Sequence, residues 1–371
     1  MSQSELIGEG ERIMTVCNSC RYCEGFCAVF PAMDRRLNFA EADLNYLANL
    51  CHNCSECLYA CQYAPPHAFA VNVPLTLAKI RLRSYEKYCW PSVLASAFKL
   101  HGIKTVVGIA IAMFICLSAA TLAFGHRDLV GPGANGNFYS VVPHQMMAGI
   151  FGAVFIFVIA AMIISIRSYL KDTGEDAAVA SRSGSMLRGL RDAMSLRNLH
   201  ASGENCTTSE NVRRPWRRWF HHLTFYGFLL CFAATSVASV YHFGLHWEAP
   251  YPFLSAPVLL GTVGGVGLII GPLGLRASRV SGDPAVSDSE RTGLEDGFIM
   301  LLVLTSITGL ALLLLRNSNV MGLLLLAHLA VVLTLMLTLP YGKFVHGLYR
   351  VAALIRAARE EASPHQLEVL P

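Results

Sequence analysis

The sequence of 371 residues predicts an all-α protein with a small N-terminal module and a bundle of six transmembrane helices. Hydrophobic residues make up 54% of the chain and charged residues only 15%, whereas an ordinary soluble protein carries about 25% charged residues. The apolar residues gather in six long runs after Lys104, and two groups of four cysteines precede them. We therefore expect a cysteine module at residues 1–102, a membrane domain at 103–350 and a cytoplasmic tail at 351–371.

The composition excludes several other classes of protein. The formal net charge of +4 is too small to indicate a nucleic acid or another polyanion as a partner. Secreted proteins that depend on disulfide bonds are short and polar, and this chain with its 12 cysteines is neither. The N-terminal residues are polar, so that no signal peptide is expected.

Two tandem groups of cysteines have the same spacing. The segments CNSCRYCEGFC (17–27) and CHNCSECLYAC (51–61) both read C-x2-C-x2-C-x3-C. This spacing is typical of proteins with two [4Fe–4S] clusters, in which the fourth cysteine of each group ligates the other cluster. We therefore expect one cluster on Cys17, Cys20, Cys23 and Cys61, and the other on Cys51, Cys54, Cys57 and Cys27.

Zinc and disulfide bonds are the two alternatives for so many cysteines. Zinc sites with four cysteines are built from two pairs of ligands, whereas each group here is a triplet followed by a fourth cysteine. Disulfide bonds are rare in the cytoplasm, where the charge distribution places this module. The other four cysteines have no partner at metal-ligand spacing and are given no function: Cys89, Cys116, Cys206 and Cys231.

The segment between the two cysteine groups predicts a helix. In RRLNFAEADLNYLANL (35–50), apolar residues recur at helical spacing, at Leu37, Ala40, Leu44, Leu47 and Leu50. Bacterial ferredoxins continue with proline after the fourth cysteine, but Ala28 and Gln62 stand there in this chain. The module therefore resembles the all-helical ferredoxin module of succinate dehydrogenase iron–sulfur subunits more than the small ferredoxins that contain β-strands.

The membrane domain is predicted from six apolar runs, since about 20 residues of helix cross a bilayer. All but two of the 29 Lys and Arg residues fall on one side of such a bundle, the exceptions being Arg127 and Arg316. Because positive charge is enriched on the cytoplasmic side, we expect a multi-pass protein of the bacterial inner membrane with both termini in the cytoplasm. The runs lie near residues 105–124, 144–166, 222–243, 253–275, 297–315 and 320–341.

The connections between the runs carry further signals. The loop 167–218 contains a polar stretch rich in Gly and Ser, which is typical of a flexible surface. Its end, RRPWRRW (213–219), predicts an anchor that contacts membrane lipid headgroups. The glycine-rich run GTVGGVGLIIG (261–271) has no strand before it, which excludes a nucleotide-binding loop. Instead, two glycine pairs predict close packing of helices, Gly261/Gly265 and Gly267/Gly271.

Histidines in the membrane runs are candidate ligands of haem b. Iron–sulfur clusters beside a membrane domain need an electron acceptor, and a haem held by two histidines fixes one at a defined depth. The sequence has no C-x-x-C-H motif for covalent haem. His328 lies inside the sixth run, where ionisable groups are functional candidates. Its partner is expected in the outer half, where His144 is preferred over His242.

A second haem position is expected at the cytoplasmic side. His346 follows His328 by a whole number of helical turns, so that both share one face if the helix continues through Pro340. The stretch PYGKFVH (340–346) resembles the end of the last haem-bearing helix in respiratory nitrate reductase gamma subunits. The third run opens on the same side with two histidines, and either one is the expected partner of His346: His221 or His222. His101, at the start of the first run, is an alternative ligand.

Two longer segments resemble a known family. The tracts EADLNYLANLCHNCSECLYACQYAPPHAFAVNVP (41–74) and RRWFHHLTFYGFLLCFAAT (217–235) are similar to the tricarballylate/citrate-utilisation protein B family, and the similarity runs from about Cys17 to Arg350. The resemblance implies a membrane subunit with two [4Fe–4S] clusters and one or two b-type haems. It also implies that the subunit reoxidises the FADH2 of a separate tricarballylate dehydrogenase flavoprotein and passes the electrons to the quinone pool.

We therefore expect an electron-transfer subunit of an oxidoreductase complex. The chain shows no acid–base pair in a soluble pocket, so that the substrate chemistry is expected on the partner flavoprotein. One alternative is a membrane transporter whose clusters sense the redox state, although the apolar runs contain no Asp, Glu, Lys or Arg that would bind a carboxylate. Another is a haem-free iron–sulfur subunit that reduces quinone directly.

Overall fold

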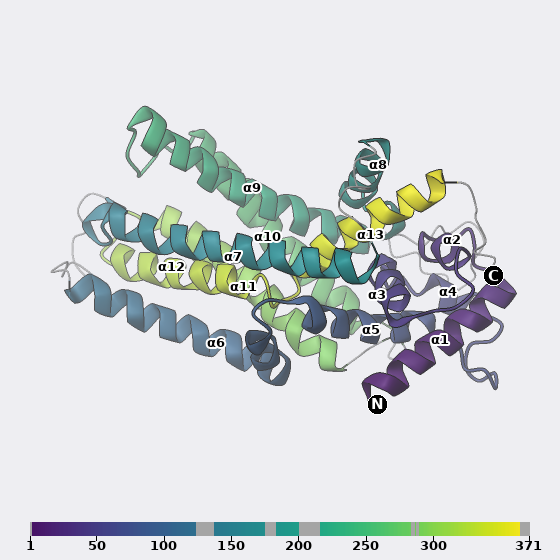
Figure 1. Ribbon diagram of the computed structural model, residues 1–371. Coiled ribbons are helices and arrows are strands. Elements are labelled where there is room, and N and C mark those ends of the chain that lie inside the picture. Colours follow the sequence, from purple (N-terminus) through teal and green to yellow (C-terminus); the bar gives the residue numbers. More distant parts are fainter. Residues whose placement is uncertain are drawn as a thin grey trace.

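The computed structural model describes residues 2–123, 137–174, 183–199, 216–282, 286 and 289–363. All regular elements of this part of the chain are helices, and none of its residues lies in a strand. Figure 1 shows the short helices of the cysteine module at one end and the long helices of the membrane domain extending from it. The predicted all-α fold is confirmed.

Polar side chains fix where the two longest helices of the module begin. Ser2 and Glu5 form a capping box, in which the Glu5 amide donates to the Ser2 hydroxyl at 3.3 Å and the Ser2 amide donates to the Glu5 carboxylate at 2.7 Å. Asn72 caps the helix that carries Pro74 in its first turn. The helices of the module are α1 (Gln3–Cys20), α2 (Val29–Met33), α3 (Glu41–Leu50), α4 (Glu56–Tyr59) and α5 (Val73–Tyr88).

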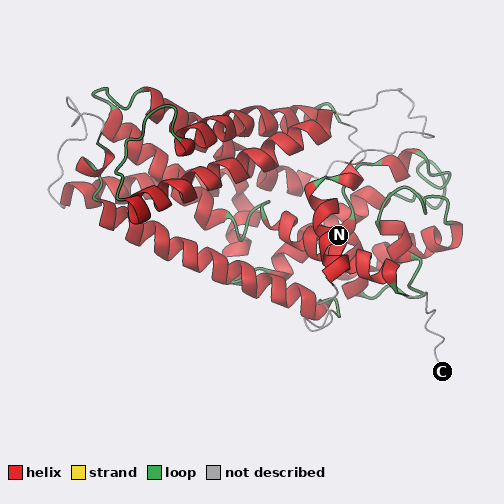
Figure 2. Cartoon of the chain, turned by 90° about the horizontal axis from the view of Figure 1, so that it is seen from above, coloured by secondary structure: helices red, strands yellow, loops and turns green. Residues whose placement is uncertain are grey.

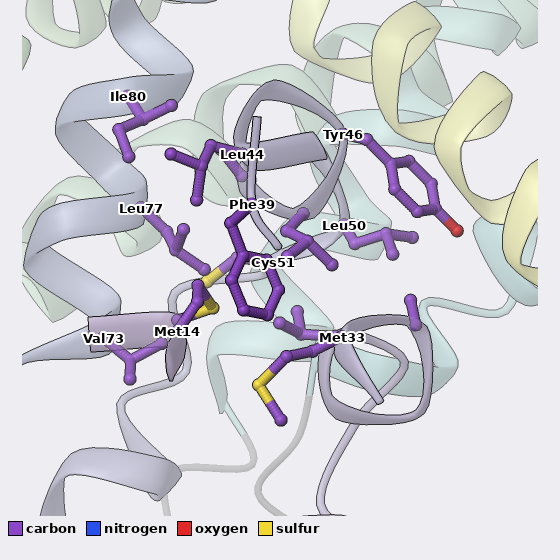
Figure 3. Close-up of a cluster of buried hydrophobic side chains, with 14 of the residues drawn as sticks. Met14, Met33, Phe39, Leu44, Tyr46, Leu50, Cys51, Val73, Leu77 and Ile80 are labelled. Atoms are coloured by element: carbon purple, nitrogen blue, oxygen red, sulfur yellow. The ribbon is translucent and has the colours of Figure 1, made fainter. Parts of the chain in front are cut away.

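A single core joins α1, α3 and α5. Met14, Leu44 and Leu77 are fully buried there, and Figure 3 shows these side chains converging from the three helices. The helix predicted over residues 35–50 begins only at Glu41, and Arg36, which precedes it, pairs with Asp43 and Glu360. Leu37 is therefore 59% exposed rather than on the core face, and the prediction was wrong for the first residues of this segment.

Among the described residues, six helices are long and apolar enough to cross a membrane, which confirms the predicted number. Figure 2 shows them side by side from above. The first of them, α6, turns at Gly102, whose φ of 25° is non-helical, and its candidate span starts at that residue. The helices are α6 (Ser92–Ala123), α7 (His144–Asp172), α9 (Trp216–Leu245), α10 (Ala256–Val280), α11 (Ser289–Leu314) and α12 (Met321–Thr338).

The last apolar helix does not continue to His346. Helix α12 ends at Thr338, and a separate helix, α13 (Val345–Ala362), follows. Pro340 lies between them, and proline ends helices because it lacks an N–H group and its ring clashes with the preceding turn. His328 and His346 therefore lie on different helices, and the shared face expected of one continuous helix does not exist.

The C-terminal helix belongs to the core of the cysteine module. Ala353, Leu354 and Ala357 of α13 are buried in the core that α1, α3 and α5 form. Helix α8 (Ser183–Met194) packs on α13 so closely that a Cβ at Gly189 would lie 2.7 Å from Ile355. Of the polar stretch expected to form a flexible surface, DTGEDAAVASRSGSM (172–186), residues 175–182 lie outside the described residues and residues 183–186 form the first turn of α8.

Candidate iron–sulfur and haem sites

The first cysteine set, Cys17, Cys20, Cys23 and Cys61, comes from the end of α1 and the segment after α4. Cys17 and Cys20 lie in the last turn of α1, which ends at Arg21 with a φ of 55° and an amide that donates to the Cys17 carbonyl at 2.8 Å. Burial, and next the nearness of the other three thiols, raises the pKa of the Cys17 thiol to about 12. The structure therefore places Cys61, from the second cysteine group of the sequence, near three cysteines of the first group.

The second cysteine set, Cys27, Cys51, Cys54 and Cys57, lines a single pocket. Burial, and next the thiols of Cys54 and Cys51, holds the pKa of Cys27 well above its usual range. The amide of Asn53 donates to the Cys51 sulfur at 3.4 Å, and hydrogen bonds to sulfur adjust the potentials of iron–sulfur clusters. This set therefore combines the last cysteine of the first group with three of the second.

The donor sets fit clusters rather than single metal ions. No three His, Cys, Asp or Glu side chains of the described residues converge closely enough to hold one ion. Ligands of a four-iron cluster surround a larger body and lie farther apart than ligands of one ion. Buried thiols that raise one another's pKa need a cationic centre among them before they ionise. The two sets thus have the ligand type and the number of ligands that a [4Fe–4S] cluster requires.

An arginine trio, Arg81 of α5, Arg217 of α9 and Arg350 of α13, holds the loop that follows α3. Arg81 and Arg350 both donate to the carbonyl oxygen of Cys51, Arg350 at 2.6 Å. Burial, and next the charge of Arg81, lowers the pKa of Arg350 to about 10, so that its guanidinium stays charged at neutral pH. Two positive charges therefore lie beside a cysteine of the second set.

Arg217 reaches the same loop from the membrane domain. Its guanidinium donates to the carbonyl oxygens of Asn53 at 2.7 Å and His52 at 3.2 Å. The sequence placed Arg217 in an anchor for lipid headgroups, and the neighbouring Trp216 and Trp219 are exposed as such an anchor requires. For Arg217 the interpretation was wrong, because its side chain binds the cysteine module.

His221 and His346 face each other where the membrane helices meet the cysteine module. Their ring centroids lie 6.1 Å apart, with the planes at 72°. Two axial imidazole–metal bonds of about 2 Å, plus the distance from each nitrogen to its ring centre, give roughly 6 Å between centroids. The Nδ1 of His346 is hydrogen-bonded to the Lys343 carbonyl oxygen, which leaves Nε2 for a metal. The two imidazoles are spaced so that they could hold one haem between them.

The structure distinguishes His221 from its neighbour His222. Consecutive residues of a helix point in directions about 100° apart, and His222 stacks on Tyr226 with centroids 5.6 Å apart. Burial, and next the charge of Lys343, holds the pKa of His346 well below its usual range, so that its ring is neutral as a ligand must be. Of the two candidates left open by the sequence, His221 is the one beside His346.

The other two haem candidates, His328 and His144, each contact a different neighbour. The Nδ1 of His328 is 2.9 Å from the Thr308 hydroxyl on α11. His144 stacks on His242, with ring centroids 3.8 Å apart and planes at 22°, which leaves no room for a haem between these rings. The pairing of His328 with His144 stays a prediction, and the side chain of His101 lies outside the described residues.

Sequence reasoning missed the arginine trio and the buried His52. Burial, and next the charge of Arg350, holds the pKa of His52 well below its usual range, and its side chain lines the pocket of the second set. One signal was present in the sequence: Arg217 precedes His221 by four residues, and Arg350 follows His346 by four. Residues four apart share a helix face, so each arginine lies on the same face as a haem candidate.

The fold and the sites define a class of protein. In the part of the chain that the structure describes, an α-helical ferredoxin-like module with two sets of four cysteines lies at the end of six helices that are long enough to cross a membrane. This combination fits an electron-transfer protein with membrane-spanning helices.

Comparisons with known proteins show the family. The family model described as "Citrate utilization protein B" matches residues 101–366, and the "Citrate utilization protein B Fer4-like domain" matches residues 10–87. Citrate utilization protein B of Escherichia coli is 46% identical over 363 residues, which cover 97% of this chain and 94% of that relative. The chain therefore belongs to the citrate utilization protein B family, and the resemblance found in the sequence is confirmed. No solved structure matches the chain.

Proposed function

We propose that this chain is the membrane electron-transfer subunit of an oxidoreductase complex. The first and second cysteine sets each hold a [4Fe–4S] cluster, and His221 and His346 bind a haem b. When bound, these groups carry single electrons between the FADH2 of a tricarballylate dehydrogenase flavoprotein and quinone. The chain's own residues hold the redox groups and exclude water from them, while the partner flavoprotein oxidises the substrate.

The continuous series of sites supports this proposal. The charges of the second set and of Cys23 act on Cys57, so that the two cysteine sets adjoin each other. Arg217 and Arg350 bind the loop of the second set, and each stands one helical turn from a histidine of the haem pair. The order of sites is therefore first set, second set and haem pair, from the module toward the membrane helices.

We place the cysteine module and both termini on the cytoplasmic side of a bacterial inner membrane. The proposal rests on the distribution of Lys and Arg, which leaves only Arg127 and Arg316 on the opposite side. A flavoprotein in the cytoplasm then meets the module directly. A tag with a reactive cysteine, fused to either terminus, tests this placement. In intact cells, a thiol reagent that does not cross the membrane should leave a tag on the cytoplasmic side unlabelled.

The assignment of the two cysteine sets is tested by paired substitutions. Loss of either Cys27 or Cys51 should remove the same cluster, so that the double variant Cys27→Ser/Cys51→Ser keeps about half the iron. The double variant Cys27→Ser/Cys17→Ser should lose both clusters. Iron and acid-labile sulfide are measured in the purified protein, with Cys116→Ser, an exposed cysteine of α6, as the control. Equal iron in both double variants would contradict the assignment.

The haem pair is tested by substituting adjacent histidines. His221→Ala and His346→Ala should each remove a haem band from the reduced-minus-oxidised absorption spectrum, because a single imidazole holds a haem much more weakly than two. His222→Ala is the matched control, and its spectrum should be unchanged since its ring stacks on Tyr226. An unchanged spectrum in the His346→Ala variant would contradict the assignment of this pair as haem ligands.

The function itself is tested in proteoliposomes. The flavoprotein, reduced by tricarballylate, should reduce quinone only when this chain is present, and the His346→Ala variant should slow that transfer. Reduction of quinone at the same rate without the chain would exclude the proposed role.

A further inference from the structure

We infer that the arginine trio makes the second cysteine set the stronger electron acceptor of the two and so directs electrons toward the haem pair. This inference rests on the proposed function, because it concerns the clusters that the two sets would hold. The trio consists of positioning residues, which act through the charge that they place beside the second set.

The hydrogen bonds of the trio converge on one short loop. Arg81 donates to the carbonyl oxygen of Ala48 at 3.2 Å as well as to Cys51, and its side chain is almost fully buried. Arg350 donates to Asn49 at 3.2 Å in addition to Cys51. Arg217 donates to the carbonyl oxygens of residues 52 and 53. These bonds fix where the three guanidinium groups lie relative to the second set.

The trio places positive charge at this loop. Arg81 and Arg350 both donate to the Cys51 carbonyl oxygen, and Arg217 donates to the carbonyl oxygen of Asn53, one residue before Cys54. Four cysteine thiolates around a cluster make the whole group anionic, and an added electron makes it more so. The trio therefore stabilises the reduced form of the group that the second set holds.

The surroundings of the first set are different. Arg21, which ends α1 beside Cys20, is half exposed and pairs with Asp34 at 3.0 Å. Arg12, also on α1, pairs with Glu9 at 2.8 Å and is 42% exposed. These pairs are neutral overall and screened by solvent. The electrostatic stabilisation of an added electron is thus greater at the second set.

The resulting step is a one-electron exchange between the two sets. The reduced group on the first set gives up one electron and the oxidised group on the second set accepts it, with no proton or bond exchanged. The electrons enter from the flavoprotein and leave to quinone, as proposed above. Because Arg217 and Arg350 lie on the helix faces of His221 and His346, the favoured acceptor is also the one that adjoins the haem pair.

The experiment is a redox titration followed by electron paramagnetic resonance. Variants with only one set intact, Cys17→Ser and Cys51→Ser, first identify which signal belongs to which set. Arg350→Gln should then lower the midpoint potential of the second cluster and leave that of the first unchanged. The expected shift disfavours electron transfer between the sets about tenfold, which corresponds to about 59 mV for one electron.

Further variants separate charge from structure. Arg350→Lys keeps the positive charge and should restore most of the potential, whereas Arg21→Gln should move neither potential. If Arg350→Gln prevents folding, Arg217→Gln provides the same test from α9. A trio that only holds the loop in place would lower the iron content of the glutamine variants without shifting the potential of the cluster that remains.

The outcomes also separate this inference from the proposed function. The inference alone would be overturned if the cluster of the second set had the lower midpoint potential of the two. It would also be overturned if that potential did not respond to Arg350→Gln and Arg217→Gln. Absence of two clusters from the unaltered protein would overturn the proposed function itself.

Discussion

Glu360 of α13 fastens the C-terminal helix to the cysteine module. Its carboxylate accepts hydrogen bonds from Arg36 at 2.6 Å, Arg356 at 2.9 Å and the Tyr46 hydroxyl at 3.0 Å. Both guanidinium groups also lie near the Tyr46 ring, at 4.9 Å and 4.1 Å from its centroid. Figure 3 shows Tyr46 extending from α3 toward α13, drawn in yellow. One carboxylate thus joins residues that are more than 300 positions apart in the sequence.

This network predicts a dependence of stability on pH. Burial raises the pKa of Glu360, but the hydrogen bonds and charges of Arg36 and Arg356 outweigh it and leave the pKa below its usual value. The stabilisation is complete above the glutamate pKa of the unfolded chain, about 4.3, and is lost as the pH falls through the lower folded-state pKa. Thermal unfolding of the purified protein between neutral and acidic pH measures this loss.

Substitution of Glu360 separates its contribution from other acidic groups. Glu360→Gln should cost about 2 kcal/mol at neutral pH, since charged hydrogen bonds are replaced by weaker ones, and should flatten the pH dependence. Glu361→Gln is the matched control, because the adjacent Glu361 pairs with Arg188 at the exposed surface and such pairs contribute little. Equal effects of the two substitutions would show that the network is unimportant.

Glycines of α10 determine how closely α9 approaches it. A Cβ at Gly264 would lie 2.8 Å from both the Cys231 sulfur and the Gly227 carbonyl oxygen, and one at Gly271 would lie 2.6 Å from the amide of Thr224. Of the glycine pairs predicted from the sequence, both members of Gly267/Gly271 face α9. A Cβ at Gly267 would lie 3.1 Å from a backbone oxygen of that helix. Gly265 instead faces α11, where a Cβ would lie 3.4 Å from the Leu310 side chain. Because α9 carries His221, this contact also positions His221 beside His346.

The α9–α10 contact yields a prediction with an internal control. Gly264→Ala should separate the two helices and destabilise the protein by about 1–3 kcal/mol, the usual cost of overpacking. Gly261→Ala introduces the same methyl group one turn away, where the nearest atom is 3.6 Å distant, and should be neutral. Thermal unfolding and the haem spectrum are the measurements. A destabilised Gly261 variant beside an unaffected Gly264 variant would contradict this account of the packing.

The whole molecule is joined across its two parts by contacts between distant segments. Lys87 of α5 forms a 3.0 Å ion pair with Asp172 at the end of α7, and the Tyr88 hydroxyl donates to the same carboxylate. Helix α13, which follows the last membrane-length helix, returns to the core of the module. These contacts join the module to the helices of the bundle.

Local patterns in the sequence predicted much of this protein. The cysteine spacing indicated clusters, and the length of the apolar runs indicated six membrane helices, because both features arise within short stretches of chain. The family was also recognisable from two continuous tracts. By contrast, the start of α3 at Glu41 was mispredicted, and the preceding Arg36 pairs with Glu360, a partner far away in the sequence that no local pattern indicates.

By itself, the sequence determined which residue types were available and along which helix faces they recur. Only the tertiary structure decided that His221 rather than His222 meets His346, and that Arg81, Arg217 and Arg350 gather beside the second cysteine set. Spacing along a helix fixes the direction of each side chain relative to its neighbours. It does not fix which other helix lies in that direction, because this depends on the packing of segments that the chain brings together only when it folds.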